Sequence, residues 1–172
     1  GRVMSNGQAI KDDFSRALEV VLKLEGGYSD DPRDSGGKTQ YGITEKVARA
    51  FGYSGDMRDL TKSIAASIYK KNYWDACKCD HIPYPLSLYV FDCAVNQGSD
   101  AARKLLQAVV GVKQDGQIGA VTLAAVSRSN AEASAMYMAL RALRYTGTRS
   151  FDVYGKGWLK RLFVVAELGA KK

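Results

Sequence analysis

Helical periodicity governs this sequence, and one glycine- and aspartate-rich segment interrupts it. In the first helical pattern the apolar side chains repeat at the spacing of one helix face: Phe14, Leu18, Val21 and Leu22. Asp12 or Asp13 provides an N-terminal cap, and Gly26 is the expected stop. Residues 26–43 then combine glycine, proline and aspartate, which are typical of turns. This segment therefore predicts a small β-hairpin between two helical regions.

The rest of the sequence is predicted to be almost wholly helical. Thr44 and Thr61 are expected to cap two short helices, and the apolar run over 86–95 predicts a central buried helix. Ser99 or Asp100 is expected to cap the next helix. Four helices should follow one another in the second half, over 99–110, 119–126, 130–145 and 151–168. We thus expect an α+β, mostly α-helical fold with about seven or eight helices and one small hairpin.

The composition is that of a globular domain. The chain has 172 residues, of which 46% are hydrophobic and 25% are charged, and these values exclude an intrinsically disordered protein. We find no run of about 18 apolar residues that could span a bilayer, and no apolar core of a signal peptide. One compact domain over residues 1–172 is therefore expected.

A metal site is not expected. Cys77, Cys79 and His81 lie close together, but their C-x-C spacing lacks a second pair of ligands, so zinc binding is not predicted. The three cysteines, Cys77, Cys79 and Cys93, are an odd number of thiols, which favours synthesis in a reducing compartment. Acid catalysis by carboxyl groups needs neither metal nor nucleotide, so we expect no cofactor.

Two carboxylates in dissimilar surroundings carry the functional prediction. Glu25 ends the first helix, where the helix dipole and a partly apolar cleft both disfavour a charged carboxylate and favour the proton of a general acid. Gly26 and Gly27 leave that acid unobstructed. Asp34 lies nine residues later in a polar loop and should stay ionised, where it could orient a water or stabilise an oxocarbenium ion. This division of roles is the equipment of a glycosidase.

Three short motifs together resemble one enzyme family. They are Glu25-Gly26-Gly27-Tyr28, Asp34-Ser35-Gly36-Gly37 and Tyr41-Gly42-Ile43-Thr44. Residues 14–92 resemble the catalytic region of glycoside hydrolase family 108, the bacterial and phage N-acetylmuramidases with a Glu-Gly-Gly-Tyr motif. The strings at 91–98, 105–107 and 115–119 resemble the predicted peptidoglycan-binding region that accompanies this family, so residues 93–172 are expected to form a helical subdomain of that kind.

The resemblance implies a lysozyme-like fold, with the hairpin beside the catalytic cleft and Glu25 as the essential acid. It also implies a phage endolysin that hydrolyses the bond between N-acetylmuramic acid and N-acetylglucosamine in bacterial peptidoglycan. A lytic transglycosylase is a close alternative, because it needs one acid/base glutamate and leaves 1,6-anhydro-muramoyl ends. A non-catalytic peptidoglycan-binding or secretion-assisting protein is the alternative from another class.

Assisting and substrate-binding residues are implied more loosely. By similarity to phage-type lysozymes, a threonine hydroxyl should join the two carboxylates, and both Thr39 and Thr44 fit. Aromatic rings and amides bind glycans, which makes six residues candidates for substrate contact: Tyr28, Tyr41, Tyr73, Trp74, Asn96 and Gln97. Tyr73 and Trp74 also fit a core position at helical spacing, and Asn96 equally fits a local cap.

The net charge of +7 is concentrated at the end of the chain. Residues 141–172 hold eight basic and two acidic residues. We expect the segment from Lys156 to Lys172 to attract an anionic envelope surface, with Trp158, Leu162 and Phe163 on one helix face. A solvated helix face explains the same charges. Nucleic acid is not an expected partner, because no recognition motif is present.

Cellular location and oligomeric state follow from these expectations. An enzyme without a signal peptide is expected to accumulate in the host cytoplasm and to reach the cell wall after the membrane is permeabilised. A monomer is expected.

Overall fold

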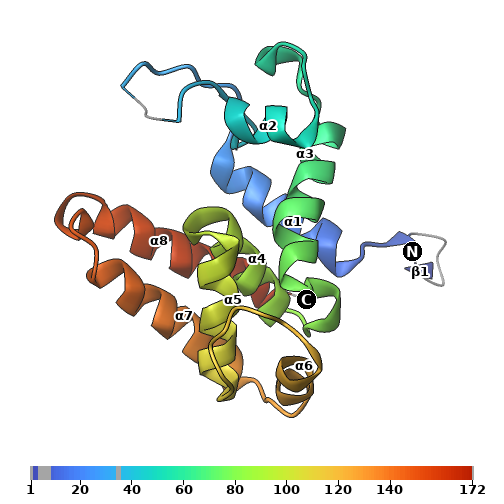
Figure 1. Cartoon of the computed structure of the whole chain (residues 1–172), viewed down its shortest axis with the longest axis vertical. Helices are drawn as coiled ribbons and strands as arrows, with labels where there is room; N and C mark the ends of the chain where they lie inside the picture. Colours follow the sequence, from blue (N-terminus) through green and yellow to red (C-terminus); the bar gives the residue numbers. More distant parts are fainter. Residues whose placement is uncertain (1, 4–8, 34–35, 172) are drawn as a thin grey trace.

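The computed structural model describes residues 2–3, 9–33 and 36–171, and these residues are mostly α-helical (Figure 1). This confirms the predicted fold class. Within that part of the chain eight α-helices follow one another: α1 Asp13–Glu25, α2 Glu45–Phe51, α3 Lys62–Tyr69, α4 Leu86–Gln97, α5 Ser99–Val110, α6 Ala120–Ser127, α7 Glu132–Thr146 and α8 Phe151–Gly169. Single turns of 3-10 or π-helix occupy Met57–Asp59, Lys70–Trp74, Asp75–Cys77 and Cys79–His81.

The capping residues of the first half act as predicted. The Asp12 side chain accepts a hydrogen bond from the Ser15 amide at the start of α1, and Gly26 ends this helix with φ of 77°. Thr44 and Thr61 accept amide hydrogen bonds at the starts of α2 and α3. The prediction for α5 was wrong, because neither Ser99 nor Asp100 caps it and the Ser99 hydroxyl instead donates to the Asn72 carbonyl.

The predicted hairpin is present, and its strands cover only a small part of the segment 26–43 from which it was predicted. Strand β3 (Thr39–Gln40) pairs antiparallel with β4 (Ile43–Thr44). A further bridge joins Ser29 to Thr39 through two backbone hydrogen bonds, of 2.9 and 2.8 Å. A second short antiparallel pair, β1 (Arg2–Val3) with β2 (Ala9–Ile10), was not predicted.

Helix α4 is the central helix of the molecule, as its apolar sequence predicts. Every residue from Leu86 to Ala94 is buried, and α4 packs against α1, α5, α7 and α8. The expected boundary between residues 92 and 93 falls inside this helix. The two parts of the chain therefore share one core. One charged side chain, Asp92, lies in the middle of this apolar helix.

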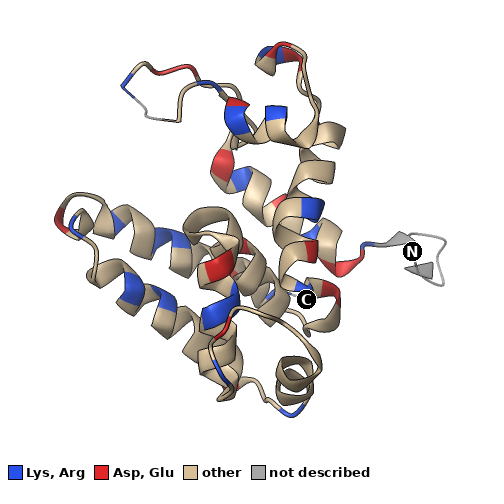
Figure 2. Ribbon diagram, viewed as in Figure 1, with Lys and Arg blue, Asp and Glu red and all other residues tan. Residues whose placement is uncertain are grey.

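The last two helices bring the end of the chain back to its beginning. α7 and α8 run side by side, and α8 also packs against α1 and α4 (Figure 1). Many of the lysine and arginine residues of the second half lie on these two helices (Figure 2). This return of α8 places C-terminal residues next to Glu25.

Candidate active site

Glu25 occupies the last position of α1, at the edge of the core. The buried residues Ala17, Val20 and Val21 anchor the other face of this helix. The Glu25 side chain keeps 22% of its surface exposed. A Cβ atom at Gly26 or Gly27 would meet nothing within 4 Å, so the space beside these two glycines is open. The carboxyl is thus half-sheltered and still reachable by a large substrate.

The turn of the hairpin lies directly against Glu25. Gly42 adopts φ of +79°, and a Cβ atom there would stand 2.7 Å from the Glu25 Cβ and 2.6 Å from the Tyr69 hydroxyl. The Tyr69 hydroxyl donates a 2.7 Å hydrogen bond to the Tyr41 carbonyl, which fastens the turn to α3. Glycine at position 42 is therefore what allows the hairpin to close onto the candidate acid.

Two tyrosines form the apolar side of this site. Burial first, and then the nearby Glu25 carboxylate, raise the pKa values of both Tyr69 and Tyr73. The rings of these two tyrosines are 5.7 Å apart, between centroids. Both phenols consequently stay protonated near neutral pH, and the Tyr69 hydroxyl uses its proton in the hydrogen bond to the Tyr41 carbonyl.

Arg161 from α8 supplies the charged side of the site. Its Nη1 lies 2.8 Å from Oε1 of Glu25, and its Nη2 lies 2.8 Å from Oδ1 of Asp92. The Arg161 side chain is only 13% exposed. Burial opposes its charge, but the Asp92 and Glu25 carboxylates outweigh this and raise the pKa of Arg161. A single guanidinium thus joins the ends of α1, α4 and α8.

Asp92 continues this chain of ion pairs into the core. Its Oδ2 accepts a 2.8 Å hydrogen bond from Nη1 of Arg141 on α7, and both side chains are fully buried. Burial alone would raise the pKa of Asp92, but the Arg141 and Arg161 guanidinium groups hold it below its ordinary value. Asp92 is therefore a buried carboxylate between two cations.

Arg141 extends the network to the end of α4. Its Nε donates a 2.8 Å hydrogen bond to Oε1 of Gln97, and its Nη2 donates a 3.3 Å hydrogen bond to the Tyr145 hydroxyl. The Tyr145 hydroxyl in turn donates to the Asn96 side-chain oxygen. Asn96 and Gln97 are thereby held in fixed orientations, which suits residues that present amides to a substrate.

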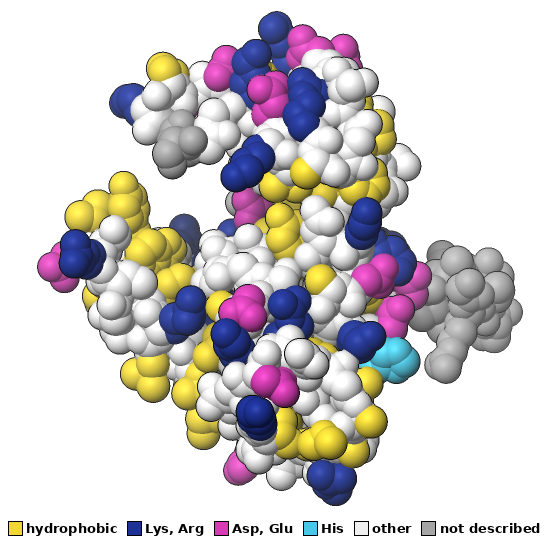
Figure 3. Space-filling model, viewed as in Figure 1, with side chains coloured by type: hydrophobic (Ala, Val, Ile, Leu, Met, Phe, Trp, Pro, Cys, Tyr) yellow, Lys and Arg dark blue, Asp and Glu magenta, His cyan; other side chains and the backbone are white. Residues whose placement is uncertain are grey.

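A hollow of about 320 Å³ opens beside this network. Residues of α1, α4 and α8 line it: Leu24, Asn96, Gly157, Trp158, Lys160, Arg161 and Val164. In the space-filling view the molecule is indented between the lobe of α2 and α3 and the lobe of α7 and α8 (Figure 3). A polysaccharide chain that approaches Glu25 would meet amide, ammonium and indole groups there.

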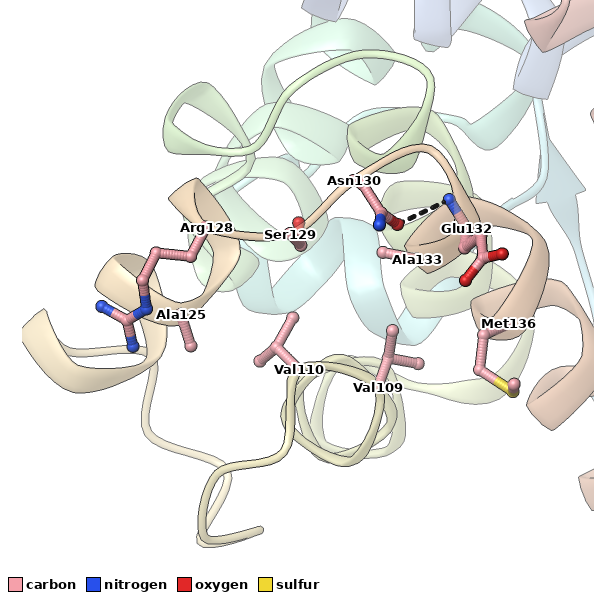
Figure 4. A pocket seen from close by; sticks show the side chains of 9 residues that line it. All are labelled: Val109, Val110, Ala125, Arg128, Ser129, Asn130, Glu132, Ala133 and Met136. Atoms are coloured by element: carbon pink, nitrogen blue, oxygen red, sulfur yellow. Dashed lines mark hydrogen bonds between the residues drawn. The ribbon is translucent and has the colours of Figure 1, made fainter.

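Another hollow, of about 370 Å³, has a different character. It lies between α5, α7 and the segment that joins α6 to α7, with Val109 and Val110 on one side (Figure 4). Glu132 and Arg128 stand on opposite sides of it, and Glu132 is the one carboxylate among its lining residues. None of its lining residues belongs to α1 or to the hairpin, so this hollow is separate from Glu25.

The structure corrects one predicted substrate contact. Trp74 has no exposed surface, and its ring packs edge-on against Phe14 and Phe91, with centroids 5.5 and 5.4 Å away. Its Nε1 donates to Asp80. Trp74 therefore belongs to the core, because the π-helical turn over Lys70–Trp74 directs it inward while the neighbouring Tyr73 stays near Glu25.

The other predicted residues are distributed around Glu25 and the hairpin. Tyr28 is 38% exposed, with the Arg58 guanidinium 5.8 Å from its ring centroid. Thr39 pairs with Ser29 through its backbone, and the Thr44 hydroxyl accepts the Val47 amide as a helix cap. Asp34 lies outside the described residues. The choice between the two threonines stays a prediction.

Sequence reasoning missed the ion pairs behind Glu25. Asp92 lies within the motif at 91–98, and Arg141 and Arg161 lie within the basic C-terminal segment, but neither pattern predicts that these residues pair. One signal could have found them: a lone carboxylate within an otherwise apolar helix requires a buried cationic partner. The sequence does not say which of many arginines that partner is.

The same finding alters the predicted basic surface. Arg141 is fully buried and Arg161 is largely buried, so neither adds to an exposed patch. The expectation that the apolar residues share one face of α8 was wrong, since Leu162 is buried and Phe163 is 75% exposed. Among the described lysines of α8 and the residues after it, Lys156, Lys160 and Lys171 are exposed.

The described residues contain neither a cluster of metal-binding side chains nor a membrane-spanning helix. No group of three or more His, Cys, Asp or Glu side chains in that part of the chain could hold a metal ion. Among the helices that the structure describes, none combines the length and apolar character needed to cross a bilayer.

These observations define a class of protein: a mostly helical, lysozyme-like fold with a half-buried glutamate beside a small hairpin. The family model of glycosyl hydrolase 108 matches residues 18–98. Among solved structures, the chain is similar to SagA of Brucella abortus, with 37% sequence identity, a TM-score of 0.80, and coverage of 90% of this chain and 92% of that chain. No curated protein matched. The chain belongs to glycosyl hydrolase family 108, and this membership implies glycoside hydrolase activity on peptidoglycan.

Proposed function

We propose that this protein is an N-acetylmuramidase that hydrolyses the bond between N-acetylmuramic acid and N-acetylglucosamine, with Glu25 as the general acid. The observation that carries the proposal is the position of Glu25. It is a partly exposed carboxyl at the end of α1, closed in by Gly42, Tyr69 and Arg161 and open above Gly26 and Gly27. Family membership supplies the substrate class.

The reaction assigns separate tasks to the groups around Glu25. Its protonated carboxyl would donate to the leaving glycosidic oxygen as the sugar develops oxocarbenium character. Asp34, from the loop between α1 and β3, would orient the attacking water or stabilise the positive sugar. Thr39 or Thr44 would hold the same water through its hydroxyl. Tyr69 and Tyr73 would shelter the Glu25 carboxyl from bulk water on the hairpin side.

The substrate would extend from Glu25 along the hollow lined by α4 and α8. Asn96 and Gln97 end α4 beside it, and both are held by the Arg141 and Tyr145 hydrogen bonds described above. These amides suit the acetamido groups of an N-acetylated glycan. Tyr28 and Tyr41 belong to the hairpin side and would contact the sugar on the opposite flank.

We further propose a biological setting as a phage endolysin, which rests on the resemblance of the sequence motifs to such enzymes. In that setting the enzyme is made in the host cytoplasm and acts on the wall after the membrane is permeabilised. Lysis of Gram-negative cells from outside should then require a permeabilising agent, whereas purified peptidoglycan should be cleaved directly.

Product analysis tests the reaction. Purified peptidoglycan is digested, and the soluble muropeptides are reduced with borohydride and identified by mass spectrometry. The muramidase proposal predicts muramitol ends. Products with 1,6-anhydro-muramic acid would instead identify a lytic transglycosylase, and reduced glucosamine ends would show that the other glycosidic bond is cleaved. A protein that binds peptidoglycan and releases no product would be a wall-binding protein only.

A further inference from the structure

The pairing between Glu25 and Arg161 raises a chemical question. A guanidinium 2.8 Å away favours the charged carboxylate, whereas a general acid must carry a proton when its substrate is bound. Arg161 must therefore hold the Glu25 carboxyl in place without preventing its protonation. The contacts on the other side of Arg161 show how this can be done.

Arg161 is held more firmly by Asp92 than by Glu25. Its Nε lies 3.2 Å from Oδ1 of Asp92 and its Nη2 lies 2.8 Å from the same oxygen, whereas a single Nη1 contact reaches Glu25. Asp92 is fully buried and Glu25 is 22% exposed, so water screens the Glu25 contact more. If Glu25 gains a proton, Arg161 keeps its stronger partner and stays in the site.

Arg141 makes this arrangement electrically balanced. It neutralises Asp92 from the core side and is itself fixed by Gln97 and Tyr145. Glu25, Arg161, Asp92 and Arg141 thus form an alternating row with as many negative as positive groups. The three groups behind Glu25 are two cations and one anion, and the Glu25 carboxylate balances the remaining positive charge.

We propose that Arg161 is the positioning residue of Glu25, and that Asp92 and Arg141 support it from the core. In this arrangement Arg161 orients the carboxyl through one N–H donor, while Asp92 retains the guanidinium when Glu25 becomes protonated. The inference rests on the proposed role of Glu25 as the acid. It also gives the C-terminal half a part in the active site, since Arg141 and Arg161 lie beyond the residues that the family model matches.

The charged and titratable groups that face Glu25 come from several elements. Arg161 approaches from α8, Tyr69 from α3 and Tyr73 from the π-helical turn, and Asp92 of α4 stands behind Arg161. Among these groups Arg161 is the one cation that the structure describes in contact with Glu25. Its removal should therefore leave the Glu25 carboxylate without its described positive partner.

Three variants of the full chain separate positioning from a purely structural role. Arg161→Gln removes both the charge and the planar guanidinium, and Arg161→Lys keeps the charge but loses the planar guanidinium that contacts both carboxylates. Lys156→Gln is the matched control, because it removes one exposed cation from the same helix and lies outside the hollow. Folding is checked by circular dichroism and thermal unfolding, and all activities are measured on purified peptidoglycan.

The first measurement follows the rate across pH. We expect Arg161→Gln to lower kcat at the optimum by about 10-fold to 100-fold, with the high-pH limb of the kcat profile shifted upward. Arg161→Lys should lower kcat by a similar factor, but with a smaller shift of the high-pH limb. Lys156→Gln should match the wild type. A folded Arg161→Gln variant with the wild-type kcat and the wild-type profile would overturn the proposal.

The second measurement does not depend on activity. The Glu25 carboxyl is titrated by NMR in protein labelled with carboxyl-¹³C glutamate and assigned with Glu25→Gln. A higher midpoint in Arg161→Gln than in wild type and Lys156→Gln supports the proposal. An unchanged midpoint contradicts it. A wild type that shows the Arg161-dependent midpoint but releases no muropeptide would refute the proposed reaction rather than the contact between Arg161 and Glu25.

Discussion

The carboxyl of Glu25 and the guanidinium of Arg161 form a 2.8 Å ion pair, although they belong to the first and the last helix of the chain. This contact makes the candidate active site a property of the whole fold. Glu25 is provided by α1, its apolar surroundings by α3 and the hairpin, and its cation by α8. Substitutions in any of these elements should therefore alter the surroundings of the Glu25 carboxyl.

The turn of the hairpin gives a sharp test of this dependence. Gly42→Ala would place a Cβ atom 2.6 Å from the Tyr69 hydroxyl and 2.7 Å from the Glu25 Cβ, at a positive φ. We expect a loss of about 2 kcal/mol or more in the free energy of unfolding, together with reduced activity in the folded fraction. Gly119→Ala is the control, because a Cβ there meets nothing within 4 Å. Equal stability and activity of the two variants would contradict the packing described for Gly42.

Asp92 should contribute stability that depends on pH. Its pKa in the folded protein lies below the ordinary value of 3.8, so its stabilising effect is present above about pH 4 and is lost as pH falls through the folded-state pKa. Asp92→Asn should therefore lower the free energy of unfolding by about 3–5 kcal/mol at pH 7, because it leaves Arg141 unpaired in the core.

The measurement for Asp92 is chemical denaturation of both proteins at pH 7 and near pH 2.5. The difference in unfolding free energy between wild type and variant should shrink at the lower pH, where the wild-type carboxyl also approaches protonation. A difference that is the same at both pH values would show that the pairing with Arg141 and Arg161 does not stabilise the charged form of Asp92.

The position of Trp74 predicts an effect on stability without an effect on substrate binding. Trp74→Phe removes the 2.7 Å hydrogen bond to Asp80 and part of the packing against Phe14 and Phe91. We expect a loss of about 1–3 kcal/mol in unfolding free energy and an unchanged KM on soluble peptidoglycan fragments. A raised KM in a fully folded variant would restore Trp74 as a substrate contact.

Local chemistry explains why much of the fold could be predicted from the sequence. Asp12 and Gly26 delimit α1 through backbone caps, and the unbroken apolar run of α4 leaves a central position as its natural place. Such features depend on near neighbours in the chain. The fold class, the helices and the hairpin followed from them.

The remaining features depend on contacts between distant segments. Ser99 reads as a helix cap, yet its hydroxyl is taken by the Asn72 carbonyl. Trp74 fits both a cleft and a core position in the sequence, and the structure places it in the core. Arg161 reads as one of many surface cations, and only the return of α8 to α1 places it between Glu25 and Asp92. Periodicity and charge counts carry no information on such pairings.

The central claim is that Glu25 is the acid of a muramidase, and one comparison tests it most directly. Release of reducing muramic-acid ends from purified peptidoglycan is measured for wild type, Glu25→Gln and Glu19→Gln, which alters an exposed glutamate of the same helix. The account predicts that Glu25→Gln loses at least about 100-fold in rate while it keeps its fold and its binding to the wall, and that Glu19→Gln stays fully active. A folded Glu25→Gln protein that cleaves at the wild-type rate would contradict the account.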